Sequence, residues 1–141
     1  MGWVMKLLRL SVVLALGLGL ADAAMAHEQK LEGTEWGLIG EQGDKARFIS
    51  FAGSGRLFGF GGCNRISGTY EQHDGQLTIS PLATTRMACE SDVMTREAEF
   101  IEMLGKVRGA QADHTLLLLL DEKGSDLRTL TQRNADQAGE Q

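Results

Sequence analysis

The chain has 141 residues and carries 14 lysines and arginines against 19 aspartates and glutamates, a formal net charge of −5. An acidic chain with scattered basic residues is a poor match to nucleic acid or to an anionic membrane surface, so we expect no nucleic-acid partner. The length suits one domain with a hydrophobic core behind an N-terminal targeting segment.

Residues 1–26 have the three-part layout of a cleavable secretory signal peptide. Lys6 and Arg9 supply positive charge, residues 10–20 are apolar, and Ala24-Met25-Ala26 places small residues before the cleavage point. The alternative is a membrane anchor, but a bilayer span needs about 20 apolar residues. We therefore predict a periplasmic or outer-membrane-associated protein with no membrane span after cleavage. Its domain would cover residues 27–131, followed by a disordered tail over residues 132–141.

The chain has two cysteines, Cys63 and Cys89. Export to an oxidising compartment favours a disulfide between them, which would close a loop of about 27 residues and stabilise the fold by roughly 3.5 kcal/mol. The alternative is two buried free thiols that pack as small hydrophobic groups. A catalytic dithiol or a metal site is disfavoured, because the sequence has neither a C-x-x-C pair nor further ligands at suitable spacing.

Short apolar runs separated by glycine predict β-strands through the first half of the domain. Phe48 and Phe51 are the expected core anchors of the second strand, and the repeated aromatics that follow suggest one inward face. Leu77 and Ile79 are expected on one face of a later strand, after a turn at His73-Asp74-Gly75. The expected strands cover residues 34–39, 46–51, 56–60, 67–71 and 76–80.

Glycines crowd together before the first cysteine, at Gly59, Gly61 and Gly62. This density predicts bulges, positive φ angles or close backbone approach. A phosphate-binding loop would need a different spacing and a helix directly after it. Asn64 is expected to fix this corner through hydrogen bonds to nearby backbone.

The second half is expected to hold one helix and a hairpin. Residues 83–89 are predicted to cross under the sheet, with threonine hydroxyls satisfying backbone groups. A helix is predicted over residues 91–108, with Ser91-Asp92 as its N-cap and Gly109 as its stop. Glu97 stands at an otherwise apolar helical position, and we assign it with Glu99 and Glu102 to a solvated face. Residues 116–120 are predicted as a strand buried on both faces, and a polar loop then leads to the final strand.

A set of motif residues runs through the domain: Trp36, Phe51, Gly59, Gly61-Gly62-Cys63-Asn64, Ser67-Gly68-Thr69-Tyr70, Leu77, Thr84-Thr85-Arg86-Met87-Ala88-Cys89, Glu97, Phe100 and Leu104. The Gly-Cys-Asn and Thr-Arg-Met-Ala-Cys elements together are the most specific. In these residues the chain resembles the META/HslJ family of small bacterial envelope proteins.

The resemblance implies an α+β fold: a mainly antiparallel, partly open β-barrel with one α-helix at about 91–108. It also implies links to heat-shock response, novobiocin resistance, and motility or secretion, and a similar fold occurs in lipid-binding secretion pilotins. The family has no established enzymatic activity. The motif residues expected to be structural are Gly61, Gly62, Asn64, Gly68, Tyr70, Thr84, Thr85, Arg86 and Met87.

No catalytic constellation is visible, since His27, His73 and His114 are far apart in sequence and lack a local serine–acid pairing. We expect no enzyme activity, no cofactor and no metal. The leading hypothesis is a monomeric envelope protein that supports stress tolerance by binding a lipid-like apolar ligand or an outer-membrane partner. Two alternatives remain: a stress-protective structural protein without a ligand, and an inhibitor of an envelope-directed hydrolase.

These hypotheses make different structural demands. A ligand carrier needs an internal cavity of at least about 300 Å³. An inhibitor needs Arg86 or Met87 to project into solvent from a rigid loop.

Overall fold

A computed structural model describes residues 28–133, which form one helix and nine strands. The predicted signal peptide and the last eight residues of the predicted tail, 134–141, lie outside the described residues. The elements are β1 (Thr34–Leu38), β2 (Phe48–Ala52), a short 3₁₀ turn (Gly53–Gly55), β3 (Arg56–Phe60), β4 (Arg65–His73), β5 (Gln76–Ile79), β6 (Ala83–Thr84), α1 (Ser91–Gly105), β7 (Gly109–Ala112), β8 (Leu116–Leu120) and β9 (Asp126–Gln132).

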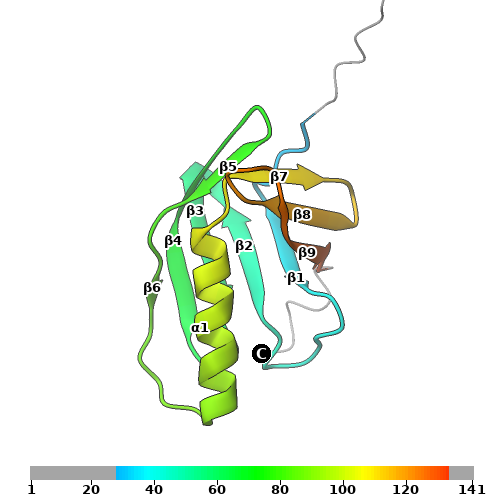
Figure 1. The fold of residues 1–141 in the computed structure, drawn as a ribbon. Coiled ribbons are helices and arrows are strands. Elements are labelled where there is room, and N and C mark those ends of the chain that lie inside the picture. Colours follow the sequence, from blue (N-terminus) through cyan, green and yellow to red (C-terminus); the bar gives the residue numbers. More distant parts are fainter. Residues whose placement is uncertain (1–27, 134–141) are drawn as a thin grey trace, which may run out of the picture.

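The strands form an antiparallel β-barrel (Figure 1). Their order is β3-β2-β1-β9-β8-β7-β5-β4, and a further pairing of β4 with β3 closes the ring. The joint between β5 and β7 has a single register pair, Gln76 with Gly109, and β6 lies against β4 beyond the end of β5. The predicted α+β barrel with one helix is confirmed.

The barrel interior is filled by side chains. Trp36, Phe51 and Leu57 are fully buried, and the ring of Phe51 meets Tyr70 edge-on at 4.8 Å between centroids. Phe100 and Leu104 of α1 and Val107, just after the helix, join the same cluster. Strand alternation produces this core, because every second residue of a strand points to the same face.

The predicted inward orientation of the aromatics is wrong for Phe48, Phe58 and Phe60. Phe48 lies three positions from the buried Phe51, so the two side chains point to opposite faces of β2. Phe48 is paired with Phe60 across the strands, and Phe58 shares their outward face. Leu57 and Ile49 point inward instead.

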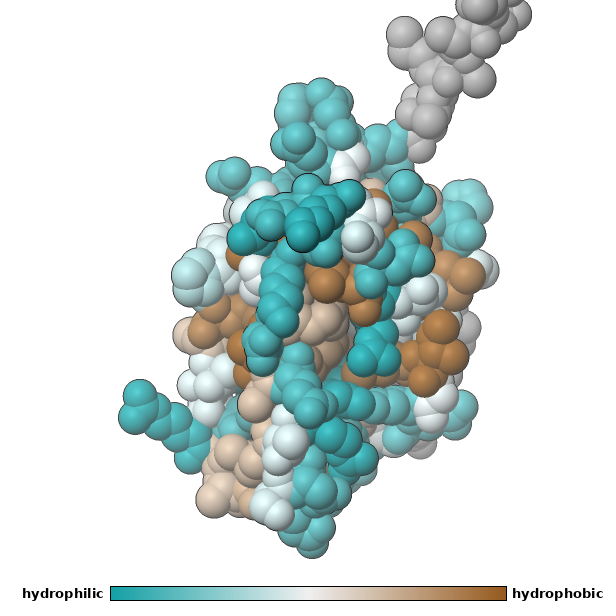
Figure 2. All heavy atoms as spheres, viewed as in Figure 1, coloured by the Kyte–Doolittle hydropathy of each residue, from teal (hydrophilic) through white to brown (hydrophobic). Residues whose placement is uncertain are grey.

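The helix is shorter than predicted. It covers Ser91–Gly105, its N-cap position is Glu90, and no side chain there bonds the first turn. Gly109 begins β7, a strand that the sequence did not predict. Figure 1 shows α1 in front of β2 and β3, and the space-filling view shows mainly hydrophilic atoms along its outer side, with apolar patches on either side (Figure 2).

The leucine strand β8 is buried on one face rather than on both. Leu117 and Leu119 are fully buried, whereas Leu116 is 43% exposed. The outer face of β8 has no covering layer among residues 28–133, because α1 packs elsewhere on the barrel.

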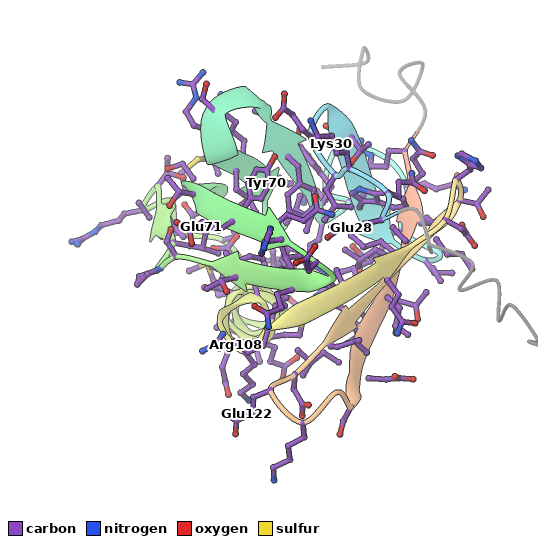
Figure 3. The ribbon with its side chains drawn as sticks, turned by 90° about the horizontal axis from the view of Figure 1, so that it is seen from above. Glu28, Lys30, Tyr70, Glu71, Arg108 and Glu122 are labelled. Atoms are coloured by element: carbon purple, nitrogen blue, oxygen red, sulfur yellow. A yellow bond between two sulfur atoms is a disulfide. The ribbon has the colours of Figure 1, made fainter. Side chains whose placement is uncertain are left out.

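The segment before β1 lies over one end of the barrel (Figure 3). The Gln72 amide accepts a hydrogen bond from the Leu31 N–H at 2.9 Å and donates to the Gln29 carbonyl at 2.8 Å. Glu28 accepts from the Gly75 N–H in the β4–β5 turn, and Leu31 is fully buried beneath. These contacts close this end of the core against solvent.

Within residues 28–133, no helix combines the length and the apolar character that a membrane span requires.

Candidate functional site: the strap and its anchor

Residues 83–90 form an exposed segment along the outer edge of β4, which we call the strap. β6 at its start pairs antiparallel with β4, in the register Ile66 to Thr84 and Ser67 to Ala83. The ladder continues with the Thr85 N–H donating to the Arg65 carbonyl at 3.1 Å. The strap therefore does not cross under the sheet as predicted, because its backbone groups find partners at the edge of the barrel.

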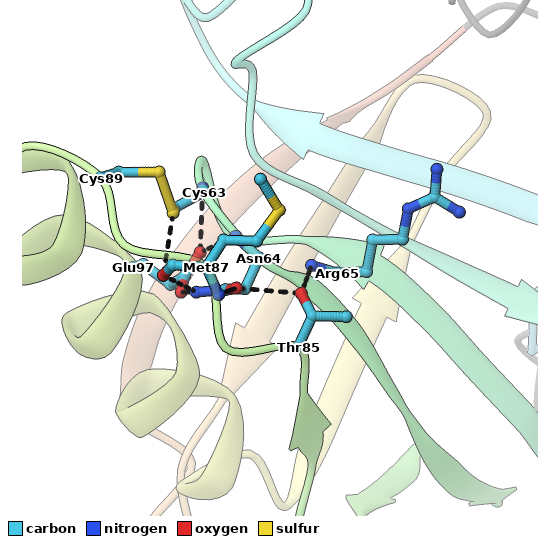
Figure 4. Close-up of a disulfide and its surroundings, with 7 residues drawn as sticks. All are labelled: Cys63, Asn64, Arg65, Thr85, Met87, Cys89 and Glu97. Atoms are coloured by element: carbon cyan, nitrogen blue, oxygen red, sulfur yellow. Dashed lines mark hydrogen bonds between the residues drawn. A yellow bond between two sulfur atoms is a disulfide. The ribbon is translucent and has the colours of Figure 1, made fainter.

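A disulfide joins Cys63, at the end of the glycine-rich turn after β3, to Cys89 in the strap (Figure 4). Cys63 is buried and Cys89 is exposed. The predicted pairing is confirmed, and no free thiol exists in residues 28–133. The bond fixes the end of the strap to the barrel core.

Asn64 holds the middle of the strap. Its side-chain oxygen accepts hydrogen bonds from the Met87 N–H at 2.6 Å and the Thr85 hydroxyl at 2.9 Å. The Thr85 hydroxyl oxygen in turn accepts from the Arg65 N–H at 3.0 Å. The predicted roles of Asn64 and of the threonine hydroxyl are confirmed in this arrangement.

Glu97 of α1 completes the anchor and is only 4% exposed. Its carboxylate accepts from the N–H groups of Cys63 at 3.0 Å and Asn64 at 2.6 Å, and from the Asn64 side-chain amide at 2.7 Å. No ion pair within residues 28–133 involves Glu97, so these N–H groups supply the compensation that a buried carboxylate requires.

The assignment of Glu97 to a solvated face is therefore wrong. The helical spacing already placed it among apolar positions, in line with the buried Phe100 and Leu104. An acidic residue on the buried stripe of a helix implies a polar partner in the core. The position of Glu97 in the sequence could therefore have predicted its burial.

Two glycines make room for this anchor. A Cβ at Gly61 would lie 2.5 Å from both Cγ and Oε2 of Glu97, so any larger residue would displace the carboxylate. Gly62 has a φ of +106°, in the region that favours glycine. The prediction of close approach and positive φ is confirmed at these positions.

The remaining motif residues lie elsewhere. A Cβ at Gly68 would meet Leu82 at 2.7 Å, and the Tyr70 hydroxyl donates to the Ala52 carbonyl at 3.2 Å at the margin of the core. Burial and the nearby Glu32 charge raise the pKa of Tyr70. Thr84 belongs to the β4–β6 ladder, and the Arg86 side chain is exposed.

A polar hollow of about 270 Å³ lies beside the glycine turn, between the loop before β2 and the start of α1. On its wall Arg47 forms an ion pair with Glu41 and donates to the Arg96 carbonyl at 3.1 Å. Burial acts to raise the pKa of Glu41, but hydrogen bonds and the charge of Arg47 outweigh it and the pKa is lowered. This pair was not predicted from the sequence, and it ties the loop to the helix.

The strap and its anchor present a fixed outer surface. The Met87 side chain is 62% exposed. Its backbone is nevertheless fixed, because the Met87 N–H donates to Asn64 and Cys89, two residues later, is bonded to Cys63 in the core. Residues 28–133 contain no cluster of three or more side chains able to bind a metal ion.

Comparison with solved structures finds the same fold in two proteins studied by NMR. One, from Burkholderia xenovorans, is 24% identical with a TM-score of 0.60, covering 74% of this chain and 84% of that one. The other is 27% identical with a TM-score of 0.55, covering 73% and 90% of the two chains. No curated protein matches the sequence.

The sequence pattern of the META domain matches residues 29–134, which include every element of the barrel and the strap with its anchor. The chain therefore belongs to the META domain family.

Proposed function

We propose that this META domain protein is exported to the bacterial envelope and acts there without catalysis, by binding an envelope protein partner through the strap. Stress tolerance would follow from that association. The observation that carries the proposal is the rigid attachment of the strap together with the exposure of Arg86 and Met87.

The packing of the core favours an outer binding surface over an internal ligand site. Trp36, Phe51 and the inward leucines fill the barrel and are fully buried. The four hollows described in the structure are open to solvent, and surface loops, strands and parts of α1 line them. The burial of these inward side chains therefore supports binding on the outside of the barrel.

A rigid strap suits recognition because little conformational entropy is lost when a pre-ordered segment binds. Methionine and arginine are both enriched at protein interfaces, the former as an adaptable apolar contact and the latter through its planar donors. The disulfide is compatible with an extracytoplasmic location.

A second candidate is an inhibitor of an envelope-directed hydrolase, with the strap entering the active-site cleft. The specific observation in its favour is the same exposed Arg86–Met87 pair on a disulfide-held segment. In this case the partner is an enzyme and its activity falls on binding.

Site-specific photo-crosslinking tests the proposal in the native envelope. A photoreactive phenylalanine analogue at position 87 should give one dominant adduct with an envelope protein, identified by mass spectrometry. The same analogue at Glu122, exposed on the β8–β9 hairpin, is the matched control and should not give that adduct. Mature protein that begins at His27 in the periplasmic fraction would establish export.

Equal adducts from both positions, or none from position 87, would exclude strap-mediated binding. If the captured partner is a hydrolase, purified protein should inhibit it, and Arg86→Ala with Met87→Ala should weaken inhibition. Native mass spectrometry of envelope-extracted protein with a stoichiometric lipid would instead revive the carrier hypothesis.

A further inference from the structure

Three phenylalanines lie on the outside of the barrel, on strands β2 and β3. Phe48 and Phe60 face each other across β2 and β3, and Phe58 lies on the same outward side of β3. Phe58 is 43% exposed. The chain has only five phenylalanines, so most of them are placed where the core does not use them.

These rings border an open hollow of about 360 Å³, whose lining also includes Asp44, Gly59, Arg65 and Ile66. The volume is at the lower end of the range for ligand sites, about 300–1,000 Å³. It suits one large apolar side chain rather than an extended acyl chain.

Two arginines flank the rings. The guanidinium of Arg56 lies 5.5 Å from the centroid of Phe58, and Arg65 is in register with Phe60 on the neighbouring strand. No ion pair within residues 28–133 involves either arginine. By contrast, Arg133, which lies 4.2 Å from the centroid of Phe48, is paired with Glu35.

Arg56 and Arg65 outnumber Asp44, the one carboxylate in the lining of the hollow, so the charge of these three residues is opposite in sign to the net charge of −5. A guanidinium binds a carboxylate through two parallel hydrogen bonds, and arginines beside aromatic rings are typical of protein interfaces. A lipid surface is less well matched, because binding to anionic headgroups draws about 1 kcal/mol from each of several basic residues.

The spacing of the arginines defines the partner further. Arg65 is opposite Phe60, which is four residues along β3 from Arg56. At about 3.3 Å per residue this separation is about 13 Å, the spacing of residues i and i+4 in an extended peptide. The midpoint, position i+2, falls over the phenylalanines.

We propose that the outer face of β2–β4 is a docking site for an extended acidic peptide segment of a partner protein. Carboxylates at positions i and i+4 bind Arg56 and Arg65, and an apolar side chain at i+2 fills the hollow between Phe48, Phe58 and Phe60. This site is carried by residues outside the strap and does not depend on the function proposed for it.

Titration of the ¹⁵N-labelled protein, residues 27–141, with the peptide Glu-Ser-Phe-Ser-Glu tests the proposal by NMR. Chemical-shift changes should be confined to β2–β4, with a dissociation constant of about 1 mM, as expected for so short a peptide. The peptides Gln-Ser-Phe-Ser-Gln and Glu-Ser-Ser-Ser-Glu should each bind at least about tenfold more weakly, the cost of losing the charged or the apolar contacts.

Two sets of variants make the test specific. Arg56→Gln with Arg65→Gln should weaken binding of the acidic peptide at least about tenfold. Phe58→Ser removes an exposed ring and should act in the same direction while the dispersed spectrum shows an intact fold. Lys123→Gln with Arg128→Gln removes two exposed charges on the β8–β9 hairpin and should leave binding unchanged.

The proposal is overturned if the three peptides bind alike, if the shifts map to another face, or if the arginine variants bind normally. Absence of shifts at 5 mM peptide, a concentration about five times the expected dissociation constant, would also overturn it. Shifts on β2–β4 with phosphatidylglycerol vesicles but not with peptide would assign the face to a membrane instead. Each result is independent of crosslinking at position 87.

Discussion

At the scale of single residues, Glu97 and Asn64 have the densest set of polar contacts. Glu97 joins α1 to the glycine turn by accepting hydrogen bonds from Asn64. Asn64 in turn accepts hydrogen bonds from Thr85 and Met87 of the strap. A buried carboxylate is unfavourable unless its hydrogen bonds are complete, and here the backbone of the turn supplies them. The pair therefore specifies one docking geometry for the helix.

Glu97→Gln should lower the free energy of unfolding by about 2 kcal/mol, since hydrogen bonds to a charged group are worth about 1.5–3 kcal/mol. The amide would also place its NH₂ group against an N–H donor, either the Asn64 side chain or the turn backbone. Urea unfolding followed by circular dichroism measures the change. Glu99→Gln, on the exposed side of the same helix, should change stability by less than about 0.5 kcal/mol. Equal effects at both positions would show that the buried network contributes little.

At the scale of elements, the leucine strand β8 shows how the barrel sorts apparently identical residues. Leu117 and Leu119 point into the core and are fully buried, whereas Leu116 is 43% exposed and Leu118 and Leu120 are half-buried. All five residues of β8 are leucine, so these positions differ in how deeply each side chain is buried and not in residue type. Their mutational sensitivity should therefore alternate along the strand.

Leu119→Ala should cost about 2–5 kcal/mol, because it removes transfer energy and leaves a cavity in a filled core. Leu116→Ala should cost less than about 1 kcal/mol, since its side chain is 43% exposed. Chemical denaturation of the two variants side by side provides the comparison. Similar losses at both sites would mean that a further layer covers the outer face of β8.

At the scale of the whole molecule, two ion pairs add side-chain contacts between separate segments of the fold. Arg47–Glu41 ties the loop before β2 to α1, and Arg133–Glu35 fixes the end of β9 beside β1. The pKa values of the two glutamates are shifted in opposite directions. The pKa of Glu41 is lowered, whereas burial raises the pKa of Glu35 despite the opposing charge of Arg133. They therefore contribute to the pH dependence of stability with opposite signs.

Glu41→Gln should lower the free energy of unfolding by about 1 kcal/mol at pH 7 and by less at pH 3. A lowered folded-state pKa means that the stabilisation is present above the unfolded value, near 4.5, and is lost as the pH falls through the folded value. Thermal or urea unfolding at the two pH values gives the difference. Glu122→Gln on the exposed hairpin should change stability by less than about 0.5 kcal/mol at pH 7. A loss at Glu41 that is as large at pH 3 as at pH 7 would contradict the charge argument.

Local chemistry in the sequence determined a large part of this fold. Glycine and Asp74-Gly75 marked the turns, period-two patterns located most of the strands, and an even cysteine count in a chain with a predicted signal peptide indicated the Cys63–Cys89 bond. The contacts of Asn64 and the crowding at Gly61 also followed from residue type, because few side chains fit those backbone conformations. β7 was missed because its four residues, Gly109–Ala112, carry no apolar alternation.

Only the tertiary structure decided which face of each strand is inside. Alternation shows that Phe58 and Phe60 share a face, but closure of the barrel puts Leu57 in the core and leaves the rings outside. For the same reason, the sequence did not identify the partner of Glu97. It also did not show that the strap lies on the outer edge of the barrel rather than under the sheet. Burial and long-range hydrogen bonds depend on which segments meet in space. Those meetings are determined jointly by residues far apart in the chain, so no local pattern predicts them.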